Sequence, residues 1–311
     1  MREDVGTPTQ PKIGWICSTQ DDEHEGRTPR YREIQTMAQE VERLGLDSFW
    51  VADHVLYRPS ANPVEERGMW EALTFLSALA ATTSRITLGT LVAPTSFRNP
   101  ALLAKMADSL DEVSDGRFVL GIGAGWHKPE YDAFGYPFDH LASRFEEAVQ
   151  VIVPLLRDGH VDFHGQYATA ENAVLRPRGP SPHGPRVLIA GRRPKMLRLV
   201  ARYTAAWNTA WHTKPEVVAE RWAEMQAICR EEGRDPATLE LTCGVVARIS
   251  LPGEPAIEDH AESISGTPEA VATALRGFID VGVQHLILAV EPQQRDTPER
   301  LGRVVDLLQR S

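Results

Sequence analysis

The amino-acid sequence predicts an α/β fold, and within that class a (β/α)8 barrel with excursions. Short apolar runs alternate eight times with longer segments whose apolar residues recur at helical spacing. The chain has 311 residues, enough for a barrel of about 250 residues with insertions. Such alternation predicts parallel strands joined by right-handed crossovers. An open doubly wound sheet is the alternative, but eight repeats favour a closed one.

Each predicted strand is a short apolar run, and each predicted helix follows one strand along the chain. The strands are expected at residues 12–19, 47–54, 85–93, 117–125, 186–191, 205–211, 239–251 and 285–291. The helices are expected at residues 30–45, 70–84, 99–116, 143–159, 193–204, 215–233, 267–282 and 297–310.

Several helix ends carry recognisable signals. The first helix ends on Gly45, and the third has Pro100 in its first turn and Gly116 just beyond its end. Thr267 and Thr297 each precede a proline, so we expect both to be N-cap residues with proline at the first helical position.

Three stretches do not fit the alternation. We interpret residues 55–69, 128–142 and 160–185 as excursions from one barrel domain that covers residues 1–311. The first and the third of them are expected to shape a substrate pocket.

Composition and charge exclude several classes of protein. The hydrophobic share of 42% and charged share of 24% are ordinary for a globular protein. A formal net charge of −10 argues against a nucleic-acid or membrane partner. The chain has no membrane-length apolar run and a polar start, so we expect a cytoplasmic protein. Three cysteines without a CxxC pair and scattered histidines predict no metal site.

Reactive residues in a barrel lie where strands end. Asp53 and His54 interrupt an apolar run at such a place, although a capping Asp beside a structural His is the alternative. The turn "GIGAGW" (121–126) lacks the last glycine of a dinucleotide fingerprint, but its glycines could admit a flat ring or a phosphate to the backbone. They could also merely relieve crowding.

A second group of residues points to an anion. Gly191 ends a predicted strand, and Arg192, Arg193 and Lys195 stand at the start of the next helix. The N–H groups of the first helical turn and these cationic side chains would then lie together at the start of the helix. We expect a negatively charged ligand group there, at the same mouth as Asp53 and His54, although a solvated surface is the alternative.

Longer stretches, chiefly "RNPALLAKMADSLDEVSDGRFVLGIGAGW" (98–126), resemble the bacterial luciferase-like family, specifically its deazaflavin-dependent oxidoreductase branch. The similarity covers roughly residues 12–235. It implies a TIM barrel that binds FMN or the deazaflavin coenzyme F420 at the C-terminal mouth. It also implies a homodimer.

The resemblance assigns roles by position. Asp53 and His54 match an Asp-His pair at the reactive side of the ring, where His54 would handle a proton and Asp53 would orient the imidazole or cap the following loop. Leu91 and Val92 match a cis peptide bond behind the ring. Gly123, Gly125 and Trp126 match the turn beside the ring and ribityl chain.

The remaining matches lie in the predicted anion site. Gly191 and Arg192 match the phosphate-binding turn, which Arg193 extends. Many relatives have a glycine-richer turn, and "TAAWN" (204–208) replaces a more usual Asp-bearing strand, so FMN stays open.

The expected function is therefore enzymatic. We expect an oxidoreductase that transfers a hydride between F420 and a small organic substrate, with His54 handling the proton. His suits that task because its reference pKa is about 6.5. One alternative is an FMN-dependent monooxygenase that uses O2, and a second is a non-catalytic flavin-binding protein.

Overall fold

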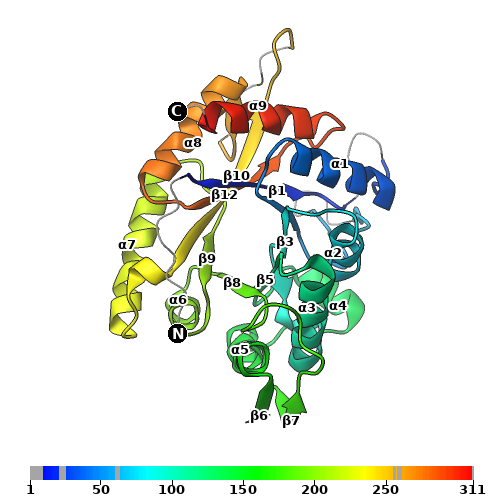
Figure 1. The fold of residues 1–311 in the computed structure, drawn as a ribbon, viewed down its shortest axis with the longest axis vertical. Coiled ribbons are helices and arrows are strands. Elements are labelled where there is room, and N and C mark those ends of the chain that lie inside the picture. The colour runs from blue at the N-terminus through cyan, green and yellow to red at the C-terminus, as the bar shows by residue number, and fades with distance from the viewer. Residues whose placement is uncertain (1–9, 21–25, 60–63, 255–256, 258–260, 310–311) are drawn as a thin grey trace. The chain divides into compact units, whose positions relative to one another are not determined.

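The structure is a computed structural model that describes residues 10–20, 26–59, 64–254, 257 and 261–309 (Figure 1). Within these residues the main sheet has ten strands in the order β11-β10-β12-β1-β2-β3-β5-β8-β9, with β4 beside β5. β9 also pairs with β10, so the strand order closes on itself. The predicted (β/α)8 class is confirmed.

Each predicted strand and helix has a counterpart in the structure. The strands of the main sheet are β1 (Lys12–Cys17), β2 (Ser48–Val51), β3 (Thr87–Thr90), β4 (Ala93–Pro94), β5 (Phe118–Gly123), β8 (Arg186–Ala190), β9 (Ala206–Thr209), β10 (Glu240–Ile249), β11 (Ile264–Gly266) and β12 (His285–Val290). The α-helices are α1 (Tyr31–Arg43), α2 (Ala72–Ala80), α3 (Pro100–Ser114), α4 (Lys128–Phe134), α5 (Leu141–Asp158), α6 (Pro194–Tyr203), α7 (Pro215–Glu231), α8 (Pro268–Asp280) and α9 (Thr297–Gln309).

Helix caps follow the local sequence with one exception. Pro100 begins α3 behind an Asn99 cap, whose side chain accepts from two backbone N–H groups. The Thr267 side chain caps α8 as expected. The prediction for Thr297 is wrong, because Thr297 lies inside α9 and its hydroxyl accepts from Gln294 N at 2.8 Å. A local sequence pattern cannot reveal that the preceding loop turns back onto the hydroxyl.

The chain divides into two compact units. The first comprises Met1–Cys17, Gln35–Trp50 and Ala190–Ser311, and the second comprises Ser18–Ile34 and Val51–Ile189. Each is described below by itself. The single barrel domain over residues 1–311 stays a prediction.

The first unit contains the parallel pairs β1–β12, β10–β12 and β10–β9. Its interior includes a buried polar group where Ser48 Oγ accepts from Trp50 Nε1 and lies 2.7 Å from His285 Nε2. Gly14 faces this group, and a Cβ there would collide with Ser48 Oγ. Buried polar atoms that bond to one another are tolerated in a core, so we interpret this group as structural.

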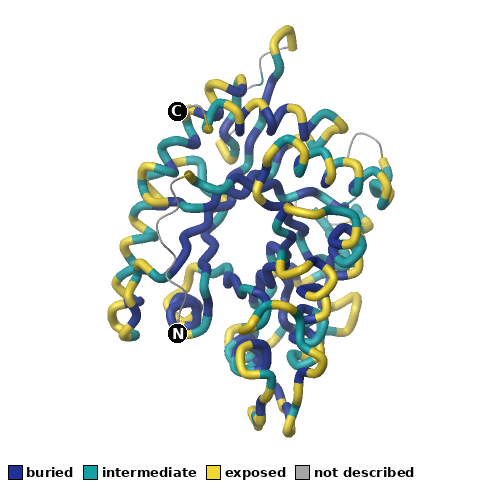
Figure 2. The backbone as a smooth tube through the Cα atoms, in the orientation of Figure 1, coloured by how far each residue is buried: buried dark blue, intermediate teal, exposed yellow. Residues whose placement is uncertain are grey.

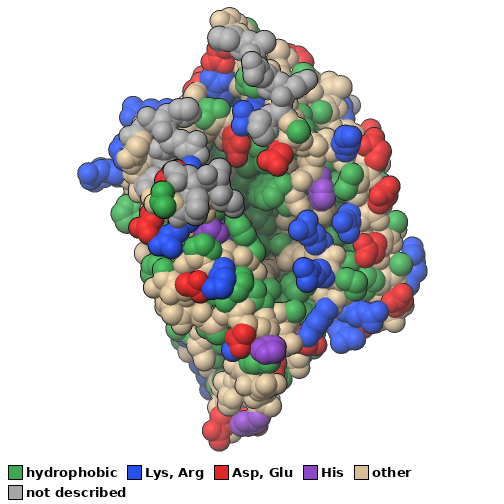
Figure 3. All heavy atoms as spheres, turned by 180° about the vertical axis from the view of Figure 1, so that it is seen from behind, with side chains coloured by type: hydrophobic (Ala, Val, Ile, Leu, Met, Phe, Trp, Pro, Cys, Tyr) green, Lys and Arg blue, Asp and Glu red, His purple; other side chains and the backbone are tan. Residues whose placement is uncertain are grey.

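The second unit contains β3, β5 and β8 as parallel neighbours. All six residues of β5 are buried, which is typical of a parallel strand covered on both faces. Figure 2 shows the strands as mostly buried tube and the helices as mixtures of buried and exposed residues. Figure 3 shows Lys and Arg side chains interspersed with Asp and Glu on the surface it draws.

The three stretches that break the alternation have structure of their own. Residues 128–142 contain α4, and residues 160–185 contain an antiparallel hairpin of β6 (His160–His164) and β7 (Thr169–Val174). In the stretch 55–69, Tyr57 and Arg67 pair as a bridge, and residues 60–63 lie outside the described part. The described helices include none that is long and apolar enough to cross a membrane.

Candidate functional site

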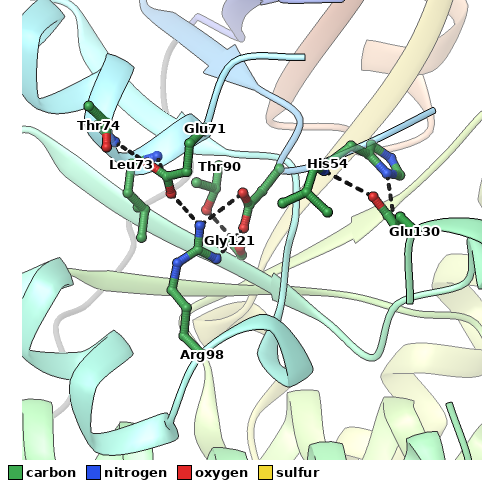
Figure 4. Close-up of polar contacts among 10 residues, drawn as sticks. His54, Glu71, Leu73, Thr74, Thr90, Arg98, Gly121 and Glu130 are labelled. Carbon is green, nitrogen blue, oxygen red and sulfur yellow. Dashed lines mark hydrogen bonds and ion pairs between the residues drawn. The ribbon is translucent and has the colours of Figure 1, made fainter. Parts of the chain in front are cut away.

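Asp53 lies at the centre of a buried ion pair in the second unit. Its side chain is fully buried, and its two oxygens accept from Arg98 Nη1 at 2.5 Å and Arg98 Nη2 at 3.1 Å. Arg98 also contacts Glu71, whose carboxylate caps α2 by accepting from Thr74 N at 2.7 Å. Figure 4 shows the Arg98 guanidinium pointing toward the Glu71 carboxylate. Through Arg98 and Glu71, the loop after β2 is joined to the start of α2.

Charge and burial act against each other in this group. Burial raises the pKa of the Asp53 carboxyl, and hydrogen bonds from Arg98 offset part of that rise. Burial alone would lower the pKa of Arg98, but the two carboxylates more than compensate and raise it. Arg98 therefore stays cationic, and its charge holds the buried Asp53 in place.

His54 has a different partner. Its Nδ1 lies 2.9 Å from Glu130 Oε1, and Glu130 Oε2 accepts from Val55 N at 3.0 Å. Glu130 is buried in α4, while the His54 side chain remains 17% exposed (Figure 4). The prediction that Asp53 orients the imidazole or caps the following loop is wrong, because Arg98 occupies both Asp53 oxygens and Glu130 holds the imidazole.

Glu130 and Arg98 are the residues that sequence reasoning missed. Glu130 lies in the stretch 128–142, which the sequence marked only as an excursion. Arg98 stands next to the predicted helix at 99–116. A carboxylate or guanidinium near a strand end gives no sign of its partner, so the sequence held no signal that could pair either residue.

Aromatic rings surround His54. The ring centroids of Tyr57, Trp126 and His127 lie 6.0, 5.8 and 6.0 Å from its own. Trp126 is 62% exposed, so a large apolar surface next to His54 is open. Burial lowers the pKa of His127, and His127 Nε2 accepts from Arg58 N at 3.0 Å, which requires that nitrogen to be unprotonated.

The backbone turns predicted to lie beside a ring are close together in the same unit. The peptide bond Leu91–Val92 is cis, as predicted, and separates β3 from β4. A Cβ at Gly123 would collide with the Val92 side chain. Gly125 has φ 83°, and a Cβ there would collide with the Tyr131 hydroxyl. These glycines therefore have a packing reason within the protein, whether or not they also admit a ligand.

Gly191, Arg192 and Arg193 belong to the first unit and precede α6. Gly191 O accepts from Trp207 Nε1 at 2.8 Å. Both arginines are exposed, and among the described residues neither side chain has a hydrogen bond or ion pair. α6 begins with Pro194 and lacks a side-chain cap. Two open guanidinium groups beside uncapped helix N–H groups can bind an anion.

The first unit also has a feature that the sequence did not indicate. The bond Ala210–Trp211 is cis and follows β9, and a Cβ at Gly244 would collide with Ala210 and Trp211. Thr209 Oγ1 lies 2.7 Å from His212 Nε2.

Over the described part of the chain, no group of three or more His, Cys, Asp or Glu residues could hold a metal ion.

Two relatives show the range of activities in similar proteins. The pyrimidine monooxygenase RutA of Klebsiella pneumoniae is 31% identical over 71% of this chain and 61% of its own length. The chain thus spans about three fifths of the length of that monooxygenase. The F420-dependent glucose-6-phosphate dehydrogenase of Kineococcus radiotolerans is 30% identical over 89% of this chain and 93% of its own length.

Solved structures share the fold at lower identity. The coenzyme F420-dependent tetrahydromethanopterin reductase of Methanopyrus kandleri gives a TM-score of 0.77 at 19% identity, over 96% of this chain and 99% of the other. An F420-dependent secondary alcohol dehydrogenase gives 0.79 at 20% identity, over 96% of this chain and 99% of the other. The profile of a family described as luciferase-like monooxygenase matches residues 12–283. The chain therefore belongs to the luciferase-like monooxygenase family.

Proposed function

We propose that the protein is an F420-dependent oxidoreductase that transfers a hydride between this deazaflavin and a small organic substrate. The observation that carries the proposal is the environment of His54, a partly exposed imidazole held by a buried carboxylate beside the open face of Trp126. A histidine in such a place can exchange a proton with a bound substrate.

The residues at the start of α6 fit an acidic coenzyme. The side chains of Arg192 and Arg193 have no acceptor among the described residues, and no side chain caps α6. Phosphate and carboxylate groups are the natural ligands of such a helix start. We propose that these donors and Gly191 hold the phosphate and acidic tail of F420.

The family resemblance assigns other residues to the ring. We propose that the backbone at Leu91–Val92 and the turn through Gly123 and Gly125 support it, with Trp126 beside it. When bound, F420 would supply or accept the hydride at its central ring carbon. His54 would give or take the accompanying proton, and Asp53, through Arg98, would hold the strand end on which His54 stands.

Relatives support this choice over FMN without deciding it. The F420-dependent dehydrogenase aligns along 93% of its own length, whereas the pyrimidine monooxygenase aligns along 61%. An FMN-dependent monooxygenase that uses O2 is the second candidate, because that relative is 31% identical. A homodimer and a cytoplasmic location stay predictions.

Fluorescence titration of the purified protein with oxidised F420 and with FMN tests the proposal. We expect F420 to bind at least about tenfold more tightly, a difference of about 1.4 kcal/mol. The variant R192Q/R193Q should weaken F420 binding about tenfold or more. R198Q, in the same helix but paired with Glu231 at 3.5 Å, is the control and should leave binding unchanged. Tight binding of FMN with weak binding of F420 would favour the monooxygenase. Binding without turnover of any substrate would favour the non-catalytic flavin-binding protein.

A further inference from the structure

We infer that Glu130 is a positioning residue that fixes the tautomer of His54, so that Nε2 is the atom that exchanges the proton. The inference rests on the proposed function for its consequence in turnover, but the tautomer itself can be measured without any cofactor or substrate.

The geometry of Glu130 defines which nitrogen carries hydrogen. Oε1 lies 2.9 Å from His54 Nδ1, and Oε2 accepts from Val55 N at 3.0 Å. An ionised carboxylate can only accept hydrogen bonds, so the neutral imidazole must carry its hydrogen on Nδ1. Glu130 is 1% exposed, and water therefore does not compete for either oxygen.

The two bonds of Glu130 also fix the orientation of the ring. They attach one carboxylate of α4 to two consecutive residues of the loop after β2, namely the His54 side chain and the Val55 backbone. An imidazole tied at Nδ1 to a group that is itself anchored has little freedom to rotate. The ring therefore presents its other nitrogen in a constant direction.

Nε2 is the nitrogen that remains available. Among the described residues it has no hydrogen-bond partner, although three rings surround the imidazole. His127 is neutral because its Nε2 accepts from Arg58 N, and Tyr57 stacks on it at 5.0 Å. The carboxylate of the neighbouring residue, Asp53, is bound by Arg98.

The chemistry follows from this arrangement. Nε2 of the neutral ring has a lone pair and can take a proton from a substrate, which leaves an imidazolium beside the Glu130 carboxylate. An opposite charge at hydrogen-bond distance stabilises that cation. Loss of the Nε2 proton restores the neutral ring with hydrogen on Nδ1. Glu130 thus takes no proton itself and acts through His54.

Nitrogen-15 NMR of protein labelled at histidine tests the inference. The His54 signals are assigned by their loss in H54Q. We expect the neutral His54 ring of the wild-type protein to show hydrogen on Nδ1. E130Q should redistribute the hydrogen toward Nε2, because the amide nitrogen can donate to Nδ1. D132N, at an exposed carboxylate of the same helix that pairs with Lys128, is the control and should leave the spectrum unchanged.

Turnover provides a second measurement. E130Q should lower kcat by at least about tenfold while the Kd for F420 stays within about threefold, because the carboxylate acts on the proton and not on the coenzyme. A purely structural role would lower kcat and raise the Kd for F420 together.

Each outcome is informative. Hydrogen on Nε2 of His54 in the wild-type protein overturns the inference, and that spectrum does not depend on whether any variant folds. A tautomer that stays on Nδ1 in folded E130Q with unchanged kcat also overturns it. If F420 fails to bind but E130Q shifts the tautomer, the role of Glu130 stands and the proposed coenzyme is wrong.

Discussion

Replacement of Asp53 by Asn should destabilise the second unit through Arg98. In the wild-type protein both Asp53 oxygens accept hydrogen bonds from Arg98. The Asp53 side chain is 0% exposed and that of Arg98 is 10% exposed. The Asn side chain keeps one acceptor but turns an NH2 group toward the guanidinium. The variant therefore loses the charge and one hydrogen bond while the cation stays buried.

The magnitude follows from what remains around Arg98. Removal of one partner from a buried ion pair costs about 3–5 kcal/mol. Glu71 still contacts the guanidinium, and its 38% exposed side chain gives water some access to the charge. We therefore expect Asp53→Asn to lower the free energy of unfolding by about 2–3 kcal/mol. Glu71→Gln, which alters an exposed partner and a helix cap, should cost about 1 kcal/mol.

Equilibrium urea unfolding followed by tryptophan fluorescence measures these changes. A double-mutant cycle of Asp53→Asn and Arg98→Gln isolates the pair, and we expect a coupling free energy of about 1.5–3 kcal/mol. Turnover is measured on the same variants at a temperature where each remains folded.

Two results would refute the reasoning. The first is a loss below about 1 kcal/mol for Asp53→Asn together with additive effects in the cycle. The second is a stable Asp53→Asn protein whose kcat falls as far as that of a His54 variant, which would give Asp53 a direct role in the chemistry.

Three further predictions test the site at other points. His54→Ala should lower kcat by about 10²-fold with the Kd for F420 nearly retained, and unchanged turnover would remove its proton role. At Gly125 φ is 83° and a Cβ would collide with Tyr131. Gly125→Ala should therefore lower the free energy of unfolding, measured by thermal unfolding, by about 2 kcal/mol or more. Gly135→Ala is the control, because φ there is 75° but nothing lies within 4 Å of the added Cβ. It should lower the free energy of unfolding by only about 1 kcal/mol. Equal losses in the two variants would show that the collision with Tyr131 has no effect. Burial lowers the pKa of His127, so the unfolded chain binds more protons below about pH 6.5 and stability falls as the pH drops through that range. Between about pH 7.5 and about pH 5.5, the free energy of unfolding measured in urea should fall less in His127→Gln than in the wild-type protein. An equal fall in the two proteins would show that His127 is not the cause.

Local sequence patterns determined most of the fold. Apolar runs and helical periodicity placed all the strands and helices of the alternation, because the spacing of apolar residues depends on the geometry of a single element. Caps such as Asn99 with Pro100, and Thr267, were predictable for the same reason. The cis bond Leu91–Val92 was predictable from resemblance to a family, and no periodicity indicates it.

Only the tertiary structure decided which side chains act together. His54 meets Glu130, 76 residues away, and Asp53 meets Arg98, 45 residues away. The sequence placed an acid and an imidazole side by side, and adjacency suggested that they interact. In the structure the two side chains do not bind each other. Asp53 binds Arg98, which precedes α3, and His54 binds Glu130 in α4. These partners come close only when the chain has folded.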